Sequence, residues 1–465
     1  MMTASSTPKE TAIDRFATFV AEAKLSPDQQ TIDMIRNAFI DTIGCILIGA
    51  RQPVTQKTQA TLSAWGNGVA PVLGTKLSLA PPWAAMANAV AGHALEFDDW
   101  ETPGNTHPSI VIIPALLAAA AQRGVSGQAI LEAYLVGFEL IARLGEAINF
   151  EHYDAGWHST GTLGAIGAAA AVARLNGLDH TQTAQALSIA VSQAVGYTRQ
   201  FGSNAKPLQG GFAAKAGVVA TALAENGLTG QSHILEGERG LVTLMGPSDE
   251  TRLWAAIERL GKPLALTEYG LIVKPYLSCG YTHRVIDCAL QIKQHADFNP
   301  TQIARIEASV PDFHAAILPF HQPQLREEAL FSVPFCVALA LLKRGVTLAD
   351  LEAEAWTDPT IVNLISKTTF TIRRPKNPAL NYDAEDPDWV TVEMQDGTHY
   401  RAAVEFPLGS PQNPMTAEQI IEKFLLNTAY ATIDRADREA IITALTQWDK
   451  LPNINTVIQQ LRIFS

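Results

Sequence analysis

Four short segments of the sequence carry ionisable side chains next to glycine or proline residues. They are 96–100 with 106–108, 156–161, 204–211 and 274–283. Functional side chains are commonly presented on loops that a rigid scaffold holds in place. We therefore expect the chemistry of this protein at these four segments.

Each of these side chains also has a purely structural explanation. An acidic pair such as Asp98 and Asp99 commonly caps a helix or faces solvent. A histidine before proline, as at His107, is more often structural, and His158 at a helix start can simply bond to the backbone. Most lysines are exposed. No single residue decides between the two interpretations.

The elements that position these segments are mainly helices. Helical periodicity extends from about residue 12 to residue 260, and Ser26-Pro27-Asp28-Gln29 predicts a helix start with Ser26 as its cap. Alanine and glycine recur in segments such as 163–170, which permits close packing of helices in a bundle core. The predicted helices span 32–47, 82–95, 109–122, 127–148, 160–175, 181–195 and 209–225.

The pattern changes after about residue 270. Alternating or β-branched runs at 303–310, 368–374, 390–394 and 400–406 predict strands, and Asp396-Gly397 predicts a hairpin turn. Helices are predicted at 281–294, 329–344, 359–366 and 417–426, and 407–414 is typical of a linker. We predict a mainly α protein: a large all-helical domain of residues 1–268 and 408–465, with a smaller α+β lid domain of residues 269–407 inserted before the C-terminal helices.

Composition and charge restrict the class of protein. The chain has 465 residues, 47% of them hydrophobic, which favours a globular protein of two domains. Its net charge of −12 argues against nucleic-acid binding. No apolar run is long enough for a bilayer, and residues 1–15 lack the apolar core of a signal peptide. We expect a soluble protein in the cytoplasm.

Neither a cofactor nor a metal is predicted. The four cysteines form no CxxC pair, which disfavours an iron–sulfur cluster. No glycine-rich phosphate loop follows a predicted strand, and no nicotinamide or flavin fingerprint is found. Metal binding by His107 and His158 lacks a paired helical spacing such as HExxH.

The four segments, taken in order, resemble the MmgE/PrpD family. This family contains 2-methylcitrate dehydratases, cis-aconitate decarboxylases and iminodisuccinate epimerases. The matching stretches cover nearly the whole chain, and they are residues 92–99, 106–109, 156–158, 206–214, 274–276, Cys279, His283 and 331–332. Many members have Asp-Phe-Asp-Asp-Thr where this chain has Glu96-Phe97-Asp98-Asp99-Trp100. The resemblance therefore does not name the substrate.

The resemblance implies an active site in a cleft between two domains, and a homodimer. Its site histidines and lysine fall on His107, His158 and Lys206, while segment 274–283 contributes from the second domain. The catalytic residues that we predict are His107, His158, Lys206, Asp98 and Asp99. The substrate-binding residues that we predict are Glu96, Thr106, Lys274, Tyr276, Cys279, His283 and Gln209.

These residue types suit proton transfer beside a carboxylate. Such a step places negative charge on a carbon, and protonated histidine, lysine and backbone N–H groups stabilise that charge. We predict His107 and His158 as the acid–base pair, oriented by Asp98 or Asp99, and Lys206 as the ligand of a carboxylate. His283 would close the site from the second domain. The expected partner is thus a small anionic carboxylate, with neither nucleic acid nor membrane involved.

Three functions agree with this pattern. The first is a cofactor-independent lyase that dehydrates or decarboxylates a di- or tricarboxylic acid. The second is an epimerase or isomerase that uses the same enediolate intermediate. The third is a non-catalytic helical binding protein, in which His107, His158 and Lys206 would lie far apart.

Overall fold

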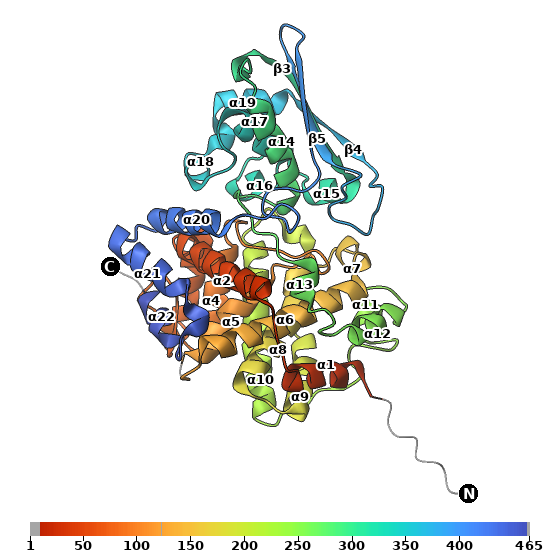
Figure 1. Ribbon diagram of the computed structural model, residues 1–465, viewed down its shortest axis with the longest axis vertical. Coiled ribbons are helices and arrows are strands. Elements are labelled where there is room, and N and C mark those ends of the chain that lie inside the picture. The colour runs from red at the N-terminus through yellow and green to blue at the C-terminus, as the bar shows by residue number, and fades with distance from the viewer. Residues whose placement is uncertain (1–9, 122, 463–465) are drawn as a thin grey trace, which may run out of the picture.

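The first part of the chain is a bundle of helices. In a computed structural model, which describes residues 10–121 and 123–462, these helices form the lower body of the molecule (Figure 1). A two-residue antiparallel pair, β1 (Ala70–Pro71) and β2 (Ser78–Leu79), interrupts them. The helices are α1 (Ala12–Glu22), α2 (Gln29–Gly49), α3 (Pro53–Ser63), α4 (Pro81–His93), α5 (Pro108–Ala120), α6 (Gly127–Ile148), α7 (Glu151–Asp154), α8 (Ser159–Asn176), α9 (His180–Val191), α10 (Ala205–Glu225), α11 (Leu241–Met245), α12 (Thr251–Glu258) and α13 (Ala265–Tyr269).

Helix α8 is the centre of the bundle. Every residue from Ser159 to Ala173 is buried, and α5, α6, α9 and α10 all pack against this helix. Its small residues make the close packing possible, because a Cβ atom added at Gly167 would lie 2.3 Å from the side chain of Ile141 on α6. A helix that is apolar on all sides belongs in a protein core. The scaffold around the N-terminus of α8 is therefore rigid.

The second part of the chain forms a four-stranded mixed sheet covered by helices. The strand order is β4-β3-β5-β6, with β3 and β4 parallel and the other neighbours antiparallel. Helix α14 packs on β5 and β6. The elements are η2 (Gly280–Thr282), α14 (His283–Lys293), β3 (Ile303–Pro311), α15 (Asp312–Ile317), α16 (Arg326–Ala329), α17 (Val333–Leu342), α18 (Leu348–Glu352), α19 (Pro359–Ser366), β4 (Thr368–Arg373), β5 (Asp388–Met394) and β6 (His399–Val404). The four predicted strands are confirmed.

The chain then returns to the helical body. Helices α20 (Ala417–Tyr430), α21 (Arg435–Leu445) and α22 (Asn455–Gln460) lie beside the N-terminal helices, and α20 packs against α2 (Figure 1). Two hydrophobic cores follow this path. One joins residues 12–271 with residues 420–461, and the other is built mainly from residues 272–404. The division at residues 268 and 408 stays a prediction, and its outer ends at 1–9 and 463–465 lie outside the described residues.

Helix starts differ from the prediction at several places; the helix predicted at 329–344 begins at Val333, after the separate short helix α16. Helix α2 is capped by Asp28, whose side chain accepts a hydrogen bond of 2.8 Å from the backbone N–H of Thr31, and Ser26 lies before the helix. Helix α10 begins at Ala205, one turn before the predicted start at Gln209. Proline is tolerated in the first turn of a helix, so Pro207 does not delay the start. As a result, Lys206 lies on a helix and not in a loop.

The predicted helix at 109–122 ends at Ala120 in the structure, and Gln122 lies outside the described residues.

Among the residues that are described, none of the helices combines the length and the apolar character that crossing a membrane requires.

Candidate active site

Three helices begin at one pocket. His107 is the N-cap residue of α5, His158 is the N-cap residue of α8, and Lys206 lies in the first turn of α10. All three line the same cavity, with an empty volume of about 400 Å³. The N-terminus of a helix carries partial positive charge and unpaired N–H groups. The pocket is therefore suited to an anion.

We call this cavity the histidine pocket. Its lining combines two histidines, two lysines and a carboxylate with a group of aromatic side chains. The lining residues are Glu96, Trp100, Asn105, His107, Tyr153, His158, Phe201, Lys206, Lys274, Cys279, Gly280, Tyr281 and Phe331. Six of the twelve predicted site residues thus meet here: Glu96, His107, His158, Lys206, Lys274 and Cys279.

Glu96 pairs with both lysines. One carboxylate oxygen accepts from the Nζ atom of Lys206, and the other lies 3.3 Å from the Nζ atom of Lys274. All three side chains are buried, and Glu96 has the unusual backbone angle φ of 54°. A non-glycine residue is held in this left-handed region only when its surroundings require it. The position of Glu96 between the two lysines is therefore built into the fold.

Contacts from two other parts of the chain hold the segment around Glu96. The backbones of Trp100 and Ile272 exchange hydrogen bonds of 3.0 and 2.8 Å, which brings the Lys274 segment alongside. On the other side, Lys423 of α20 forms a 2.7 Å ion pair with Asp41 of α2 and donates a 2.7 Å hydrogen bond to the carbonyl of Phe97. The loop between α4 and α5 is thus fastened to both cores.

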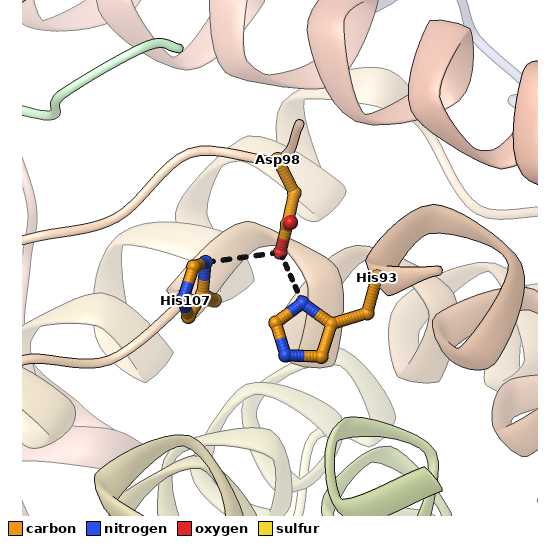
Figure 2. A group of neighbouring side chains, drawn as sticks. All are labelled: His93, Asp98 and His107. Carbon is orange, nitrogen blue, oxygen red and sulfur yellow. Dashed lines mark hydrogen bonds and ion pairs between the residues drawn. The ribbon is translucent and has the colours of Figure 1, made fainter. Parts of the chain in front are cut away.

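Asp98 bridges two histidines (Figure 2). Its Oδ2 atom lies 2.7 Å from Nδ1 of His93 and 3.1 Å from Nδ1 of His107, and Nδ1 of His107 also lies 2.9 Å from the carbonyl oxygen of Asp99. Carboxylate and carbonyl oxygens only accept hydrogen bonds, so both Nδ1 atoms carry the proton. In its neutral form, each ring therefore has its lone pair on Nε2.

His158 is oriented in the same way by a neutral partner. Its Nδ1 atom lies 3.0 Å from Oε1 of Gln209. The amide of Gln209 cannot be turned round, because the same oxygen accepts from the N–H of Tyr197 while Nε2 donates to the Tyr197 carbonyl. Nε2 of His158 therefore carries a lone pair, and it has no hydrogen-bond partner among the described residues.

Burial favours the neutral forms of His107 and His158. It lowers the pKa of His107 to about 3, although the charge of Asp98 acts in the opposite direction. Burial, with the nearby charge of Lys206, lowers the pKa of His158 well below its usual value. At neutral pH both rings can accept a proton, as a general base must.

The lysines and Glu96 remain charged. Burial opposes the charge of Glu96, but Lys206 and Lys274 outweigh it and lower the pKa of the carboxyl group. Burial likewise opposes the charge of Lys274, and Glu96 and Asp98 outweigh it, so the pKa of this lysine is raised. For Lys206, burial prevails over Glu96 and lowers the pKa. Among the residues that line the pocket, two lysines face the single carboxylate of Glu96, while the carboxylate of Asp98 lies behind His107 and offsets part of their positive charge.

His93, Asp98 and His107 are close enough together to suggest a metal site. Their ligand atoms lie within 4.8 Å of one another. However, the two Nδ1–Oδ2 distances of 2.7 and 3.1 Å are those of hydrogen bonds. Ligand atoms around a tetrahedral zinc at about 2.1 Å would lie roughly 3.4 Å apart, each with a free lone pair. Because both Nδ1 atoms donate protons, the geometry fits a hydrogen-bonded triad.

Two further residues that we predicted for the site, Asp99 and Thr106, do not line the pocket. The carboxyl group of Asp99 contacts Ser109, with Oγ at 2.5 Å, and not a histidine. The hydroxyl group of Thr106 donates a 2.6 Å hydrogen bond to Glu101. Of the two aspartates predicted to orient a histidine, Asp98 is therefore the one whose side chain contacts His107.

Asp99 should make stability depend on pH. Burial raises the pKa of its carboxyl group to about 8, well above the value in an unfolded chain. The folded protein therefore holds a proton that the unfolded chain loses above about pH 4, and this contribution to stability declines as the pH rises from about 4 to about 8. Because of Asp99, the unfolding free energy of the wild type should fall between pH 5 and pH 8. In Asp99→Asn this fall should be smaller by at least about 1 kcal/mol, roughly the free energy that corresponds to one pKa unit.

Urea denaturation at the two pH values measures this effect. Asp297→Asn, at an exposed position, is the control and should leave the pH dependence unchanged. A pH dependence that is identical in wild type and Asp99→Asn would show that Asp99 is ionised in the folded protein.

Three further predicted residues support the pocket or lie away from it. Gln209 orients His158, as described above. The hydroxyl group of Tyr276 donates a 2.7 Å hydrogen bond to Asp287, and the ring of His283 packs edge-on against Tyr276 while its Nε2 atom lies 3.3 Å from the Ser278 carbonyl. Within the described part of the chain, neither Tyr276 nor His283 lines the histidine pocket. Of the predicted site residues, His283 thus contacts Tyr276 and does not line the pocket that holds His107, His158 and Lys206.

Cys279 does line the histidine pocket. Burial raises the pKa of its thiol to about 11, so the group is neutral.

Several site residues were not predicted. His93 ends helix α4 and shares Asp98 with His107, but a buried histidine in an alanine-rich helix resembles a core residue in the sequence. Its distance of only five positions from Asp98 was the available signal. Tyr153, Phe201 and Tyr281 come from distant parts of the chain and have no pattern that distinguishes them from other aromatic core residues.

Comparison with known proteins finds matches over both parts of the chain. Residues 14–253 match the MmgE/PrpD N-terminal domain, and residues 276–450 match the MmgE/PrpD C-terminal domain. A cis-aconitate decarboxylase of Aspergillus terreus is 27% identical over 470 residues, which cover 94% of each chain. A cis-aconitate decarboxylase of Mus musculus is 27% identical and covers 92% of this chain and 88% of its own.

A 2-methylcitrate dehydratase of Cupriavidus necator is more distant, at 25% identity over 89% of each chain. The similarity to all three proteins thus extends over both parts of the fold, and the matches to the two domain models together span both sides of the histidine pocket. The chain belongs to the MmgE/PrpD family.

Proposed function

We propose that this protein is a lyase that acts on a small di- or tricarboxylic acid without a cofactor. Proton transfer at a carbon beside a carboxylate would accompany loss of water or of CO₂. The observation that carries the proposal is the histidine pocket, where two neutral histidines face the same cavity as a pair of lysines. The related cis-aconitate decarboxylases and 2-methylcitrate dehydratase carry out reactions of this class.

Lys206 and Lys274 would bind the substrate. Lys206 and Lys274 exceed the charge of Glu96, and three helix N-termini add partial positive charge. A substrate carboxylate would be held by charge-assisted hydrogen bonds. The same groups would stabilise an enediolate, because they already surround the place where its charge develops.

Proton transfer falls to His107 and His158. Each presents a lone pair at Nε2 while Nδ1 is held by a partner, Asp98 or Gln209. In a dehydration, one ring would take the proton from carbon, and the imidazolium so formed would give this proton to the leaving hydroxyl group, which departs as water. In a decarboxylation, CO₂ would leave first, and a histidine that takes up one proton from the solvent would then pass it to the carbanion.

A test uses the two acids named by the relatives. The purified full-length protein would be incubated with cis-aconitate and with 2-methylcitrate, and the products followed by ¹H NMR and mass spectrometry. We expect turnover of at least one acid, with loss of CO₂ or water. If both acids are recovered unchanged and neither binds, the proposal is wrong.

An epimerase is the alternative that the geometry also favours. Two histidines, each with its own orienting partner, line one cavity, as an enzyme needs when it removes a proton from one face of a carbon and returns one to the other. Such an enzyme would leave the mass of its substrate unchanged, whereas a lyase would not.

The binding-protein hypothesis required His107, His158 and Lys206 to lie far apart, and they share one pocket. The homodimer and the cytoplasmic location stay predictions.

A further inference from the structure

A second cavity adjoins the histidine pocket. It has an empty volume of about 520 Å³ and shares Glu96, Lys206 and Phe331 with the histidine pocket as common walls. Arg326, on the short helix α16, lines it from the sheet-containing part of the protein, and His93 lines it from the helical part. We call this cavity the arginine pocket.

Arg326 is a cation without a partner. Its Nη2 atom is buried, and within residues 10–121 and 123–462 it has no hydrogen-bond acceptor. Glu327 and Glu352 are near enough to favour its positive charge, but neither forms an ion pair with it. Arg326 as a whole is only partly buried, but a guanidinium nitrogen that is buried without an acceptor costs free energy, and such groups in proteins are normally paired or bind a ligand.

This isolation distinguishes Arg326 from the lysines beside it. Lys206 and Lys274 are both paired with Glu96, so a bound anion must share them with an internal carboxylate. Of the described lysines and arginines that line the two pockets, Arg326 alone has no carboxylate partner. Glu327 also lines the arginine pocket but forms no ion pair with Arg326, so a second anionic group can pair with this guanidinium without displacing an internal partner.

His93 provides an independent sign of a polar ligand. It is 1% exposed, and its Nε2 atom has no hydrogen-bond partner in the described part of the chain. Because Nδ1 donates to Asp98, Nε2 is the ring nitrogen left for a ligand, and in the neutral form of the ring it accepts a hydrogen bond from a hydroxyl group or a bound water. An unpaired donor and an unpaired acceptor thus line the same cavity.

We propose that Arg326 binds a second carboxylate of the substrate in the arginine pocket, while Lys206 and Lys274 hold the first. This inference rests on the proposed function and narrows its substrate class to acids whose two carboxylates are separated by several bonds. The planar guanidinium group can bind a carboxylate through two parallel hydrogen bonds. Lys206 and Glu96 belong to both cavities, so one elongated molecule can contact both sets of cations.

Calorimetric binding of tricarballylate to the full-length protein tests this proposal. This acid has three carboxylates and neither the hydroxyl group nor the double bond that a lyase would act on. Arg326→Gln is expected to weaken its binding by about 10-fold or more, the usual effect of losing a hydrogen bond between charged groups. Arg326→Lys, which keeps the charge but not the paired donors, should fall between that variant and wild type.

The matched control is Arg344→Gln. Arg344 is exposed in the same part of the fold and lines neither pocket, so tricarballylate should bind this variant as it binds wild type. Unchanged affinity in Arg326→Gln would overturn the role of Arg326. If Lys206→Met nevertheless loses binding of tricarballylate, the proposed function stands without a role for Arg326. Wild type that binds no carboxylate would contradict both the proposed function and the role of Arg326.

Discussion

His158→Asn is expected to lower kcat by about 10²- to 10⁴-fold, the range that a positioned acid or base contributes. The amide nitrogen of asparagine can take the place of Nδ1 and keep the hydrogen bond to Gln209, while the lone pair at Nε2 is lost. His107→Asn removes the corresponding lone pair and keeps a donor toward Asp98 and the Asp99 carbonyl. Steady-state kinetics with the acid identified by NMR measures both effects.

The control for these variants is His321→Asn. His321 is exposed and stacks on Phe370, outside the histidine pocket, so its loss should leave kcat within about twofold, as for most exposed substitutions. Circular dichroism would establish that all three variants are folded. If His107→Asn and His158→Asn both turn over at near the wild-type rate, the assignment of the acid–base pair is wrong.

Lys206→Met is expected to lower kcat/KM by about 10- to 150-fold, because a hydrogen bond to a charged group contributes about 1.5–3 kcal/mol. The change removes one of the two lysines proposed to bind the carboxylate and leaves Glu96 paired with Lys274 alone, so the pocket loses one positive charge. Methionine keeps most of the apolar length of the side chain, which limits the disturbance of packing around Phe201.

Lys215→Met is the matched control for this loss of charge. Lys215 lies on the same helix, over the rings of Trp83 and Phe212, and lines neither pocket. Its replacement should leave kcat/KM within about twofold of wild type, as expected of a substitution away from the site. Equal kinetics for wild type and Lys206→Met would contradict a role for Lys206 in substrate binding.

Much of the fold follows from local patterns. The strands and the turn at Asp396-Gly397 were predictable because alternation and turn chemistry act within a few residues. Helix α6 was predicted with its observed limits, since Ser126 caps it and its apolar face is continuous. The start of α10 was missed because Lys206-Pro207 resembles a loop, although proline fits a first helical turn.

The candidate site was predictable only in part. Glu96, His107, His158, Lys206 and Lys274 were expected to meet, and the structure places them in one pocket. His93 was missed because a histidine inside a helix shows its role only when the loop that follows folds back and places Asp98 against it. His283 was predicted to reach the site because its segment, 274–283, contributes to the site. The residue instead begins α14, and its ring packs against Tyr276. Side-chain direction at such positions depends on tertiary packing.

Proton transfer at carbon by His107 and His158 is the central claim, and a reaction in D₂O tests it most directly. With wild type, ¹H NMR and mass spectrometry should find deuterium bound to the carbon beside a carboxylate, in the product or in recovered substrate. With His107→Asn combined with His158→Asn, this incorporation should fall to the rate without enzyme. Incorporation by the folded double variant at the wild-type rate would contradict the account.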